Sequence, residues 1–237
     1  MVDTQVKTSW WRRHWVGPLA VLVLAFVAFS LPRYLTLDPA QSRVPEPVGH
    51  GWHYPFLVGH VVFGSVAILT CVLQIWPWLR RAHPAWHLRA GRVYVFGGVL
   101  PGGVLAVAVG AVSPFGPVNQ VGNVLMGLLW LGTTVAGYRM ARQKRYADHR
   151  RWMVRSTALT LSIITNRFWA VGLGLTLPAQ LDTTFGGSEV ALVQAIAGTS
   201  AWMGWVLPFL AVEWWLDRGR ARRRQPVAAP DRVRVGA

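Results

Sequence analysis

Long runs of apolar residues alternate with short polar segments along the whole chain. An α-helix rises about 1.5 Å per residue, so a run of about 20 apolar residues is long enough to cross the hydrocarbon core of a bilayer. We therefore predict an all-α, polytopic membrane protein with six transmembrane helices, at about residues 16–31, 57–76, 93–112, 119–138, 152–177 and 190–216.

The polar residues that interrupt these runs fall mostly in the second to fifth runs. Polar groups inside a bilayer almost always face other helices rather than lipid. These four spans are therefore predicted to form a central four-helix bundle, with the first and sixth spans at its periphery. Within the third span, Pro101 and the two glycines after it are expected to kink or loosen the helix.

Composition agrees with a membrane protein, since 53% of the residues are hydrophobic and only 14% are charged. The first run could belong to a signal peptide, but no small-residue cleavage site follows it and five further runs do. We interpret it as an uncleaved helix. Cys71 is the only cysteine, so a disulfide within the chain is excluded.

Charge gives the expected orientation. The chain has 24 Lys and Arg against 9 Asp and Glu; 21 of the basic residues fall on one side of the six spans, counting Arg155 near the end of its span. Two fall on the other side, and Arg167 lies within a span. Basic loops stay in the cytoplasm, so both termini are predicted to be cytoplasmic, as a basic segment at 1–15 and a basic, disordered tail at 217–237.

The net charge of +15 therefore follows from topology, and nucleic acid is not an expected partner. The expected partners are the lipid bilayer and, for the basic segments, anionic lipid headgroups at the cytoplasmic face.

The first candidate site lies in the half of the membrane away from the basic loops. Arg167 is a full charge inside an apolar run, and no acidic residue lies at a matching depth. It is expected either to bind an anionic or carbonyl group of a ligand or to be neutralised by backbone carbonyls and water. Polar residues of the same half complete this candidate ligand-binding set: His60, Gln120, Asn123 and Asn166.

The second candidate site is at the cytoplasmic rim, where His87 opens the third span and His149 opens the fifth. Two imidazoles at equal depth on nearby helices can ligate a haem iron or another metal, and nearby guanidinium groups can bind propionates or phosphates. The alternative is that both histidines contact headgroups or backbone. The basic residues of this candidate cofactor site are Arg89, Arg92 and Arg155. Glu213, near the inner end of the sixth span, is expected to pair with one of the rim arginines.

A third group, formed by His50, His53 and His60, has a spacing that suits a shallow zinc or copper site. No cysteine or well-placed carboxylate completes it, so we interpret it as a solvated loop and predict no metal site. The chain also lacks a phosphate-binding glycine loop, a nucleophile elbow and an H-E-x-x-H motif, and no catalytic residue is identified.

Two strings of residues carry a resemblance to a known family. They are HLRAGRVYV at residues 87–95 and HRRWMVRS at residues 149–156, and His60 and Gln74 accompany them. With these residues the chain resembles, over roughly residues 55–175, the DUF2306 family of uncharacterised bacterial integral membrane proteins. The resemblance implies a multi-pass protein of the bacterial plasma membrane. Its helical bundle is similar in outline to the small b-type cytochromes, by analogy of fold alone.

Two functions from different classes follow. The first is a cytochrome-like redox protein that binds haem b or a quinone, with His87 and His149 as axial ligands and with Arg167 and His60 as headgroup contacts. The second is a non-redox binder or carrier of a small anionic or lipidic molecule, recognised by Arg167. A visible absorption spectrum of the purified protein separates the two.

Overall fold

The computed structural model describes residues 15–224, and every regular element in this range is helical. The elements are α1 (Val16–Ser30), α2 (Pro32–Leu35), η2 (Pro39–Gln41), α3 (His53–Ile75), α4 (Pro77–Ala82), α5 (Pro84–Arg92), η3 (Val93–Val99), α6 (Leu100–Ala111), α7 (Pro117–Arg142), α8 (Tyr146–Thr176), η4 (Leu177–Gln180) and α9 (Glu189–Arg224). Six helical stretches are long and apolar enough to cross a membrane, which confirms the predicted all-helical, six-span class.

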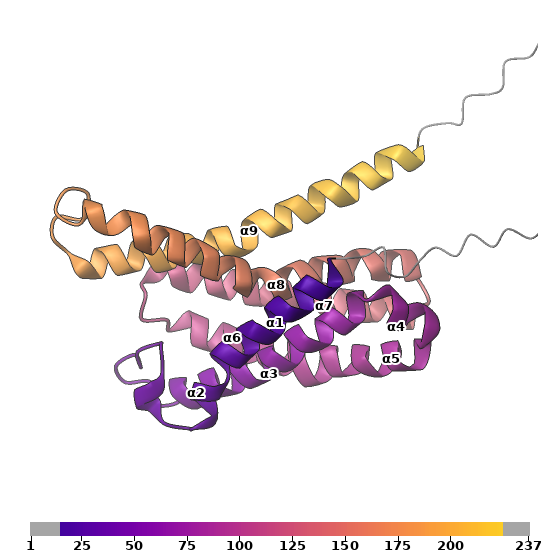
Figure 1. Cartoon of the computed structure of the whole chain (residues 1–237), viewed down its shortest axis with the longest axis horizontal. Helices are drawn as coiled ribbons and strands as arrows, with labels where there is room; N and C mark the ends of the chain where they lie inside the picture. The colour runs from indigo at the N-terminus through magenta and orange to yellow at the C-terminus, as the bar shows by residue number, and fades with distance from the viewer. Residues whose placement is uncertain (1–14, 225–237) are drawn as a thin grey trace, which may run out of the picture.

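The second to fifth spans pack side by side into the predicted bundle, formed by α3, the continuous α5–η3–α6 segment, α7 and α8 (Figure 1). The first span, α1, crosses the outside of this bundle and contacts α3 and α8 through Val23, Val27, Ile68, Val72 and Ile164. The sixth span, α9, packs along α8 and α7 and is not merely peripheral, because its Trp205 belongs to the central core.

The third span has an irregular helix, in agreement with the effect expected of its proline. It begins as α5, continues through η3, which is a π-helix, and becomes α-helical again at Leu100. Pro101 has no N–H to donate to the carbonyl one turn earlier, and the wider π turn lies just before it. The span is also longer than its apolar run, because the helix already starts at Pro84, before the string at residues 87–95.

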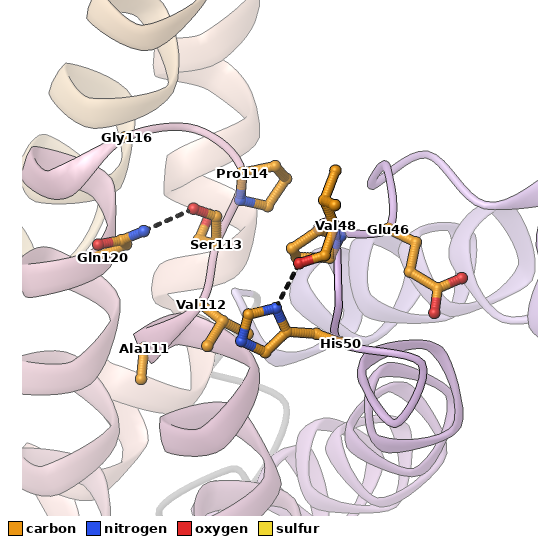
Figure 2. Close-up of a pocket in the computed structure, with 10 residues that line it drawn as sticks. Glu46, Val48, His50, Ala111, Val112, Ser113, Pro114, Gly116 and Gln120 are labelled. Carbon is orange, nitrogen blue, oxygen red and sulfur yellow. Dashed lines mark hydrogen bonds between the residues drawn. The ribbon is translucent and has the colours of Figure 1, made fainter.

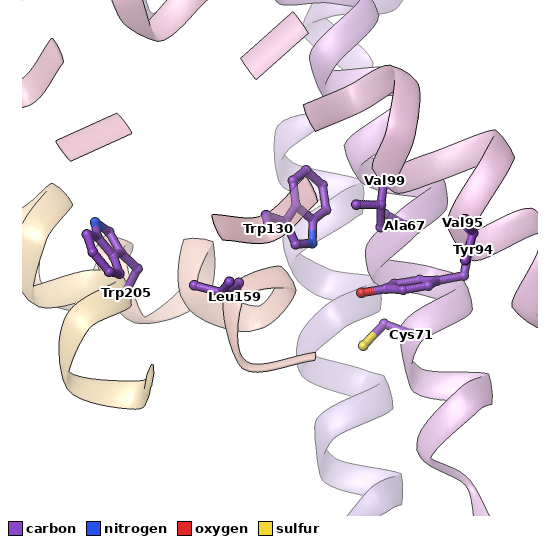
Figure 3. Close-up of a cluster of buried hydrophobic side chains, with 8 residues drawn as sticks. All are labelled: Ala67, Cys71, Tyr94, Val95, Val99, Trp130, Leu159 and Trp205. Carbon is purple, nitrogen blue, oxygen red and sulfur yellow. The ribbon is translucent and has the colours of Figure 1, made fainter. Parts of the chain in front are cut away.

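The centre of the bundle is filled by side chains of five helical segments (Figure 3). Tyr94, Val99 and Leu159 are at most 1% exposed, and Trp130 is 4% exposed. These almost completely buried side chains pack in the middle of the bundle. The core residues are Ala67, Cys71, Tyr94, Val95, Val99, Trp130, Leu159 and Trp205.

The bundle has two chemically different ends. One, here called the histidine end, contains α4, α5 and the turn between α7 and α8 (Figure 1). The start of α1 and the end of α9 also lie toward this end. The other, here called the arginine end, contains α2 and the connection to α3, and the α8–α9 turn projects beyond it. The predicted segments 1–14 and 225–237 lie outside the described residues.

Candidate functional site

His149, at the histidine end, is held in one orientation by the backbone of the neighbouring helix. Its Nδ1 lies 2.8 Å from the carbonyl oxygen of Gly137 in α7. A carbonyl only accepts hydrogen bonds, so Nδ1 carries a proton, and in the neutral imidazole Nε2 is the nitrogen with the free lone pair. Gly137 permits this close approach of α8, since a Cβ there would stand only 2.6 Å from the sulfur of Met153.

His87 lies opposite, on α5, and its imidazole is half-buried. Its backbone carbonyl accepts a hydrogen bond of 2.9 Å from Nε2 of Gln74 in α3, which fixes α5 against the bundle. Its Nδ1 is buried and has no hydrogen-bond partner. The ring lies within electrostatic range of Arg80 and of His149.

The arginines predicted for the rim fall into two groups. Arg155 forms a two-point ion pair with Glu213 of α9, at 2.5 Å from Nε to Oε1 and 2.7 Å from Nη2 to Oε2. This confirms the pairing expected for Glu213, and it leaves Arg155 engaged in binding α9 to α8. Arg89 and Arg92 are exposed on α5, and Arg89 also stacks on Trp86 at 5.4 Å from the ring centre.

A hydrogen-bonded network occupies the bundle below the two histidines. The Tyr94 hydroxyl lies 2.5 Å from Ser156 Oγ and 2.7 Å from Thr160 Oγ1. Thr134 Oγ1 lies 2.6 Å from Ser156 Oγ, and Trp130 Nε1 donates to Thr160 Oγ1 at 2.8 Å. All five residues are buried. Sequence reasoning missed this network; its signal was the spacing of four residues between Trp130 and Thr134 and between Ser156 and Thr160, which places each pair on one helix face.

The polar residues predicted for the opposite half do not form one site. His60 donates from Nδ1 to the carbonyl of Gly102 in α6 at 2.9 Å, so its ring faces the third span. Asn166 packs against α9, where its Cβ stands 2.7 Å from the position that a side chain on Gly204 would take. The neighbouring Arg167 is exposed and lies within electrostatic range of Arg43 and Tyr34, near the connection between α2 and α3.

Gln120 and Asn123 order the start of α7. Gln120 Nε2 donates to the carbonyl of Ser113 at 2.9 Å, and Asn123 Nδ2 donates to Oδ1 of the buried Asn119 at 2.7 Å. Gln120 also lines an open pocket of about 510 Å³ between this turn and residues 46–50 (Figure 2). Both amide side chains are thus engaged with their own helix and the turn before it.

The three histidines of the α3 end also face different neighbours. His50 Nδ1 donates to the carbonyl of Val48 at 2.9 Å, as Figure 2 shows, and His53 is buried at 1% exposure. His60 is bound to Gly102. Within residues 15–224 no three His, Cys, Asp or Glu side chains are grouped so as to hold a metal ion.

Comparison with known proteins identifies the family of the chain. The model of a family described as "Predicted membrane protein (DUF2306)" matches residues 57–212. This range includes His87, His149, Arg155 and the hydrogen-bonded network at the centre of the bundle. No curated protein and no solved structure matches the chain.

Proposed function

The chain belongs to DUF2306, a family of predicted membrane proteins, and on that premise we propose that it is a cytochrome-like redox protein that holds haem b at the histidine end of its bundle. His87 and His149 would hold its iron. The observation that carries this proposal is that two half-buried imidazoles on different helices lie within electrostatic range of each other, and that one of them is oriented by a backbone carbonyl.

The chemistry of His149 fits an iron ligand. Metal-bound histidines commonly donate the proton of the non-ligating nitrogen to a carbonyl, which orients the ring and makes the other nitrogen a better donor. His149 makes this bond to Gly137. His87 offers a buried nitrogen with no protein partner, and an unpartnered buried polar atom calls for an explanation such as a bound group.

The surroundings restrict the cofactor to the rim. The packed network of Tyr94, Ser156 and Thr160 fills the space below the histidines, so a haem would lie at the edge of the bundle rather than at its centre. Arg89 and Arg92 are exposed there and would receive its propionates through charge-assisted hydrogen bonds. Arg155 would act indirectly, by holding α8 to α9 through Glu213.

A bound haem supplies one-electron transfer, and the protein supplies ligands, orientation and a dry environment. A quinone, the other redox ligand considered from the sequence, is less well supported, because its expected contacts His60 and Arg167 face different neighbours. The non-redox function expected for Arg167 concerns the opposite end of the bundle and is compatible with this proposal.

The proposed location is the bacterial plasma membrane, with the histidine end and its basic loops in the cytoplasm, against anionic lipid headgroups. The family match and the excess of basic residues in these loops support this assignment.

The test is an absorption spectrum of the full chain, purified in detergent from haem-supplied cells. We expect a Soret band in the wild-type protein that His87→Ala and His149→Ala each weaken or abolish. The matched control is His83→Ala, because His83 lies at the same end, is exposed and stacks on Trp78. A colourless wild-type protein, or a band that His83→Ala removes as completely as His149→Ala, would contradict the proposal.

A further inference from the structure

Three guanidinium groups gather at the arginine end from three separate parts of the chain. Arg33 belongs to α2, Arg43 to the connection before α3, and Arg167 to α8. Arg43 Cζ lies 4.0 Å and Arg33 Cζ 5.8 Å from the ring centre of Phe29, so both flank the same aromatic side chain. Arg167 lies within electrostatic range of Arg43. Residues more than a hundred positions apart thus contribute to one basic group.

None of these three guanidinium groups forms an ion pair within 4.0 Å among residues 15–224. Asp38, on the same connection, instead accepts hydrogen bonds from the backbone N–H of Ala40 at 3.0 Å and from Gln41 at 3.3 Å. Glu46 lies further along, at the pocket beside His50. Three like charges repel one another, and an anion that joins them removes this repulsion.

One atom of the group also lacks a partner. Nε of Arg33 is buried and makes no hydrogen bond. A buried donor that gives up water without gaining an acceptor costs free energy, and this cost is larger for a charged group. A negative charge from outside the chain would offset this cost and the charges of Arg43 and Arg167 together.

The position of the group indicates where the anion comes from. Arg167 follows Ile163 and Ile164, which pack at the contact of α8 with α1 and α3, and its own side chain is exposed on the lateral surface of the bundle. Arg33 lies near the end of the first span, Val16–Leu35. Long basic side chains at the ends of spans reach the level of lipid headgroups. Arg33, at the end of its span, is therefore expected at headgroup level, and Arg43 flanks the same Phe29 ring. Arg167 comes from within its span and lies within electrostatic range of Arg43.

We propose that Arg33, Arg43 and Arg167 form a binding site for the phosphate group of an anionic lipid at the arginine end of the bundle. Guanidinium groups bind phosphate oxygens with paired, charge-assisted hydrogen bonds, and the planar ring of Phe29 keeps two of them in place. This site is independent of the histidine end and of haem. Free phosphate shares the same chemistry, so the experiment must separate the two sources.

The experiment is a titration of the delipidated full chain in detergent with phosphatidylglycerol, followed by native mass spectrometry, with phosphatidylcholine as the neutral comparison. We expect phosphatidylglycerol to bind in preference to phosphatidylcholine, and Arg43→Gln/Arg167→Gln to weaken it by about tenfold or more, since two charged hydrogen-bond donors are lost. The matched control is Arg142→Gln, which removes one exposed positive charge at the opposite end.

Each possible result of this titration either supports or overturns the proposed lipid site. Equal binding of phosphatidylglycerol by the wild type and the double variant, or an equal loss in Arg142→Gln, would overturn the site. Inorganic phosphate that displaces the lipid at equal concentration would overturn the assignment to a lipid. If the double variant fails size-exclusion chromatography, Arg43→Gln alone decides, because Arg43 is an exposed connection residue; a loss of about threefold supports the proposal and no loss overturns it.

Discussion

The two ends of the bundle both carry arginines, but only one end provides acidic partners for them. At the histidine end Arg155 pairs with Glu213, and Arg145 pairs with Asp148 at 2.6 Å. At the arginine end none of Arg33, Arg43 and Arg167 forms an ion pair within 4.0 Å among the described residues. The comparison shows that the role of an arginine at a membrane surface is indicated better by whether it has an acidic partner than by the number of charges around it. An unpartnered arginine points to a ligand, whereas a paired one stabilises the fold.

A buried core whose polar side chains hydrogen-bond to one another lies between the two ends. Tyr94, Ser156, Thr160, Thr134 and Trp130 satisfy one another's hydrogen bonds, and all are buried. A network with no unsatisfied member rigidifies a bundle and leaves no polar path open within it. We therefore expect each end to respond to mutation without the other.

The largest expected effect is in the labelling of cysteines placed at the two ends, because the ends are predicted to lie on opposite sides of the membrane. One cysteine should be labelled in intact cells and the other should not. Gln143→Cys, in the turn between α7 and α8, should escape a membrane-impermeant maleimide in intact cells, whereas Thr183→Cys, in the α8–α9 connection, should be labelled. Background labelling is low because the native Cys71 is buried. Labelling of Gln143→Cys in intact cells would place the histidine end outside and contradict the predicted orientation.

Removing the core between the ends should have the largest effect on stability. Tyr94→Ala creates a cavity and leaves hydroxyls without a partner, so we expect a loss of about 3–5 kcal/mol in the free energy of unfolding. Unfolding in detergent, followed by circular dichroism, measures it. Tyr94→Phe keeps the ring and should cost only about 1 kcal/mol. Equal losses in the two variants would show that the hydroxyl, not the packing, dominates.

Breaking the ion pair at the histidine end should have an intermediate effect. Arg155→Gln leaves the half-buried Glu213 without its two-point partner, and we expect a loss of about 1–3 kcal/mol in the free energy of unfolding. Glu189→Gln, an exposed acid at the start of the same helix, serves as the control and should change little. Unchanged unfolding of Arg155→Gln would mean that the pair contributes nothing to the α8–α9 contact.

The smallest effect should come from the equivalent change at the arginine end. Arg167→Gln removes a charge that has no carboxylate partner in the described chain, so unfolding in uncharged detergent should change by no more than about 0.5 kcal/mol. Added phosphatidylglycerol should then stabilise the wild type more than the variant, in the same unfolding assay. A loss as large as that of Arg155→Gln would reveal a protein partner for Arg167.

The spans could be predicted from the sequence because each apolar run carries its own signal, and the pairing of Glu213 followed from its depth. The start of the irregular third span was harder to predict from the sequence. Hydropathy placed it near residue 93, whereas the helix begins at Pro84. Basic residues end an apolar run without ending a helix. Hydropathy therefore locates the membrane but not the helix boundary.

The sites were harder to predict, because they depend on which way each helix faces. Asn166 and Arg167 are adjacent in sequence, yet one packs on α9 and the other is near Arg43. Arg33 and Arg43 were counted only as loop charges, since nothing in the sequence brings them to α8. The sequence predicts His87 and His149 at equal depth because both open their spans at the same side, and this prediction needs no knowledge of helix rotation.

The most direct test of the central claim, that the histidine end is a two-histidine haem site, is an electron paramagnetic resonance spectrum of the oxidised, purified protein. Two imidazole ligands give low-spin ferric iron, and we predict this signal for the wild type and for His83→Ala, with conversion to a high-spin signal in His87→Ala and in His149→Ala. A haem-containing wild type with a high-spin signal, or a low-spin signal that survives both substitutions, would contradict the claim.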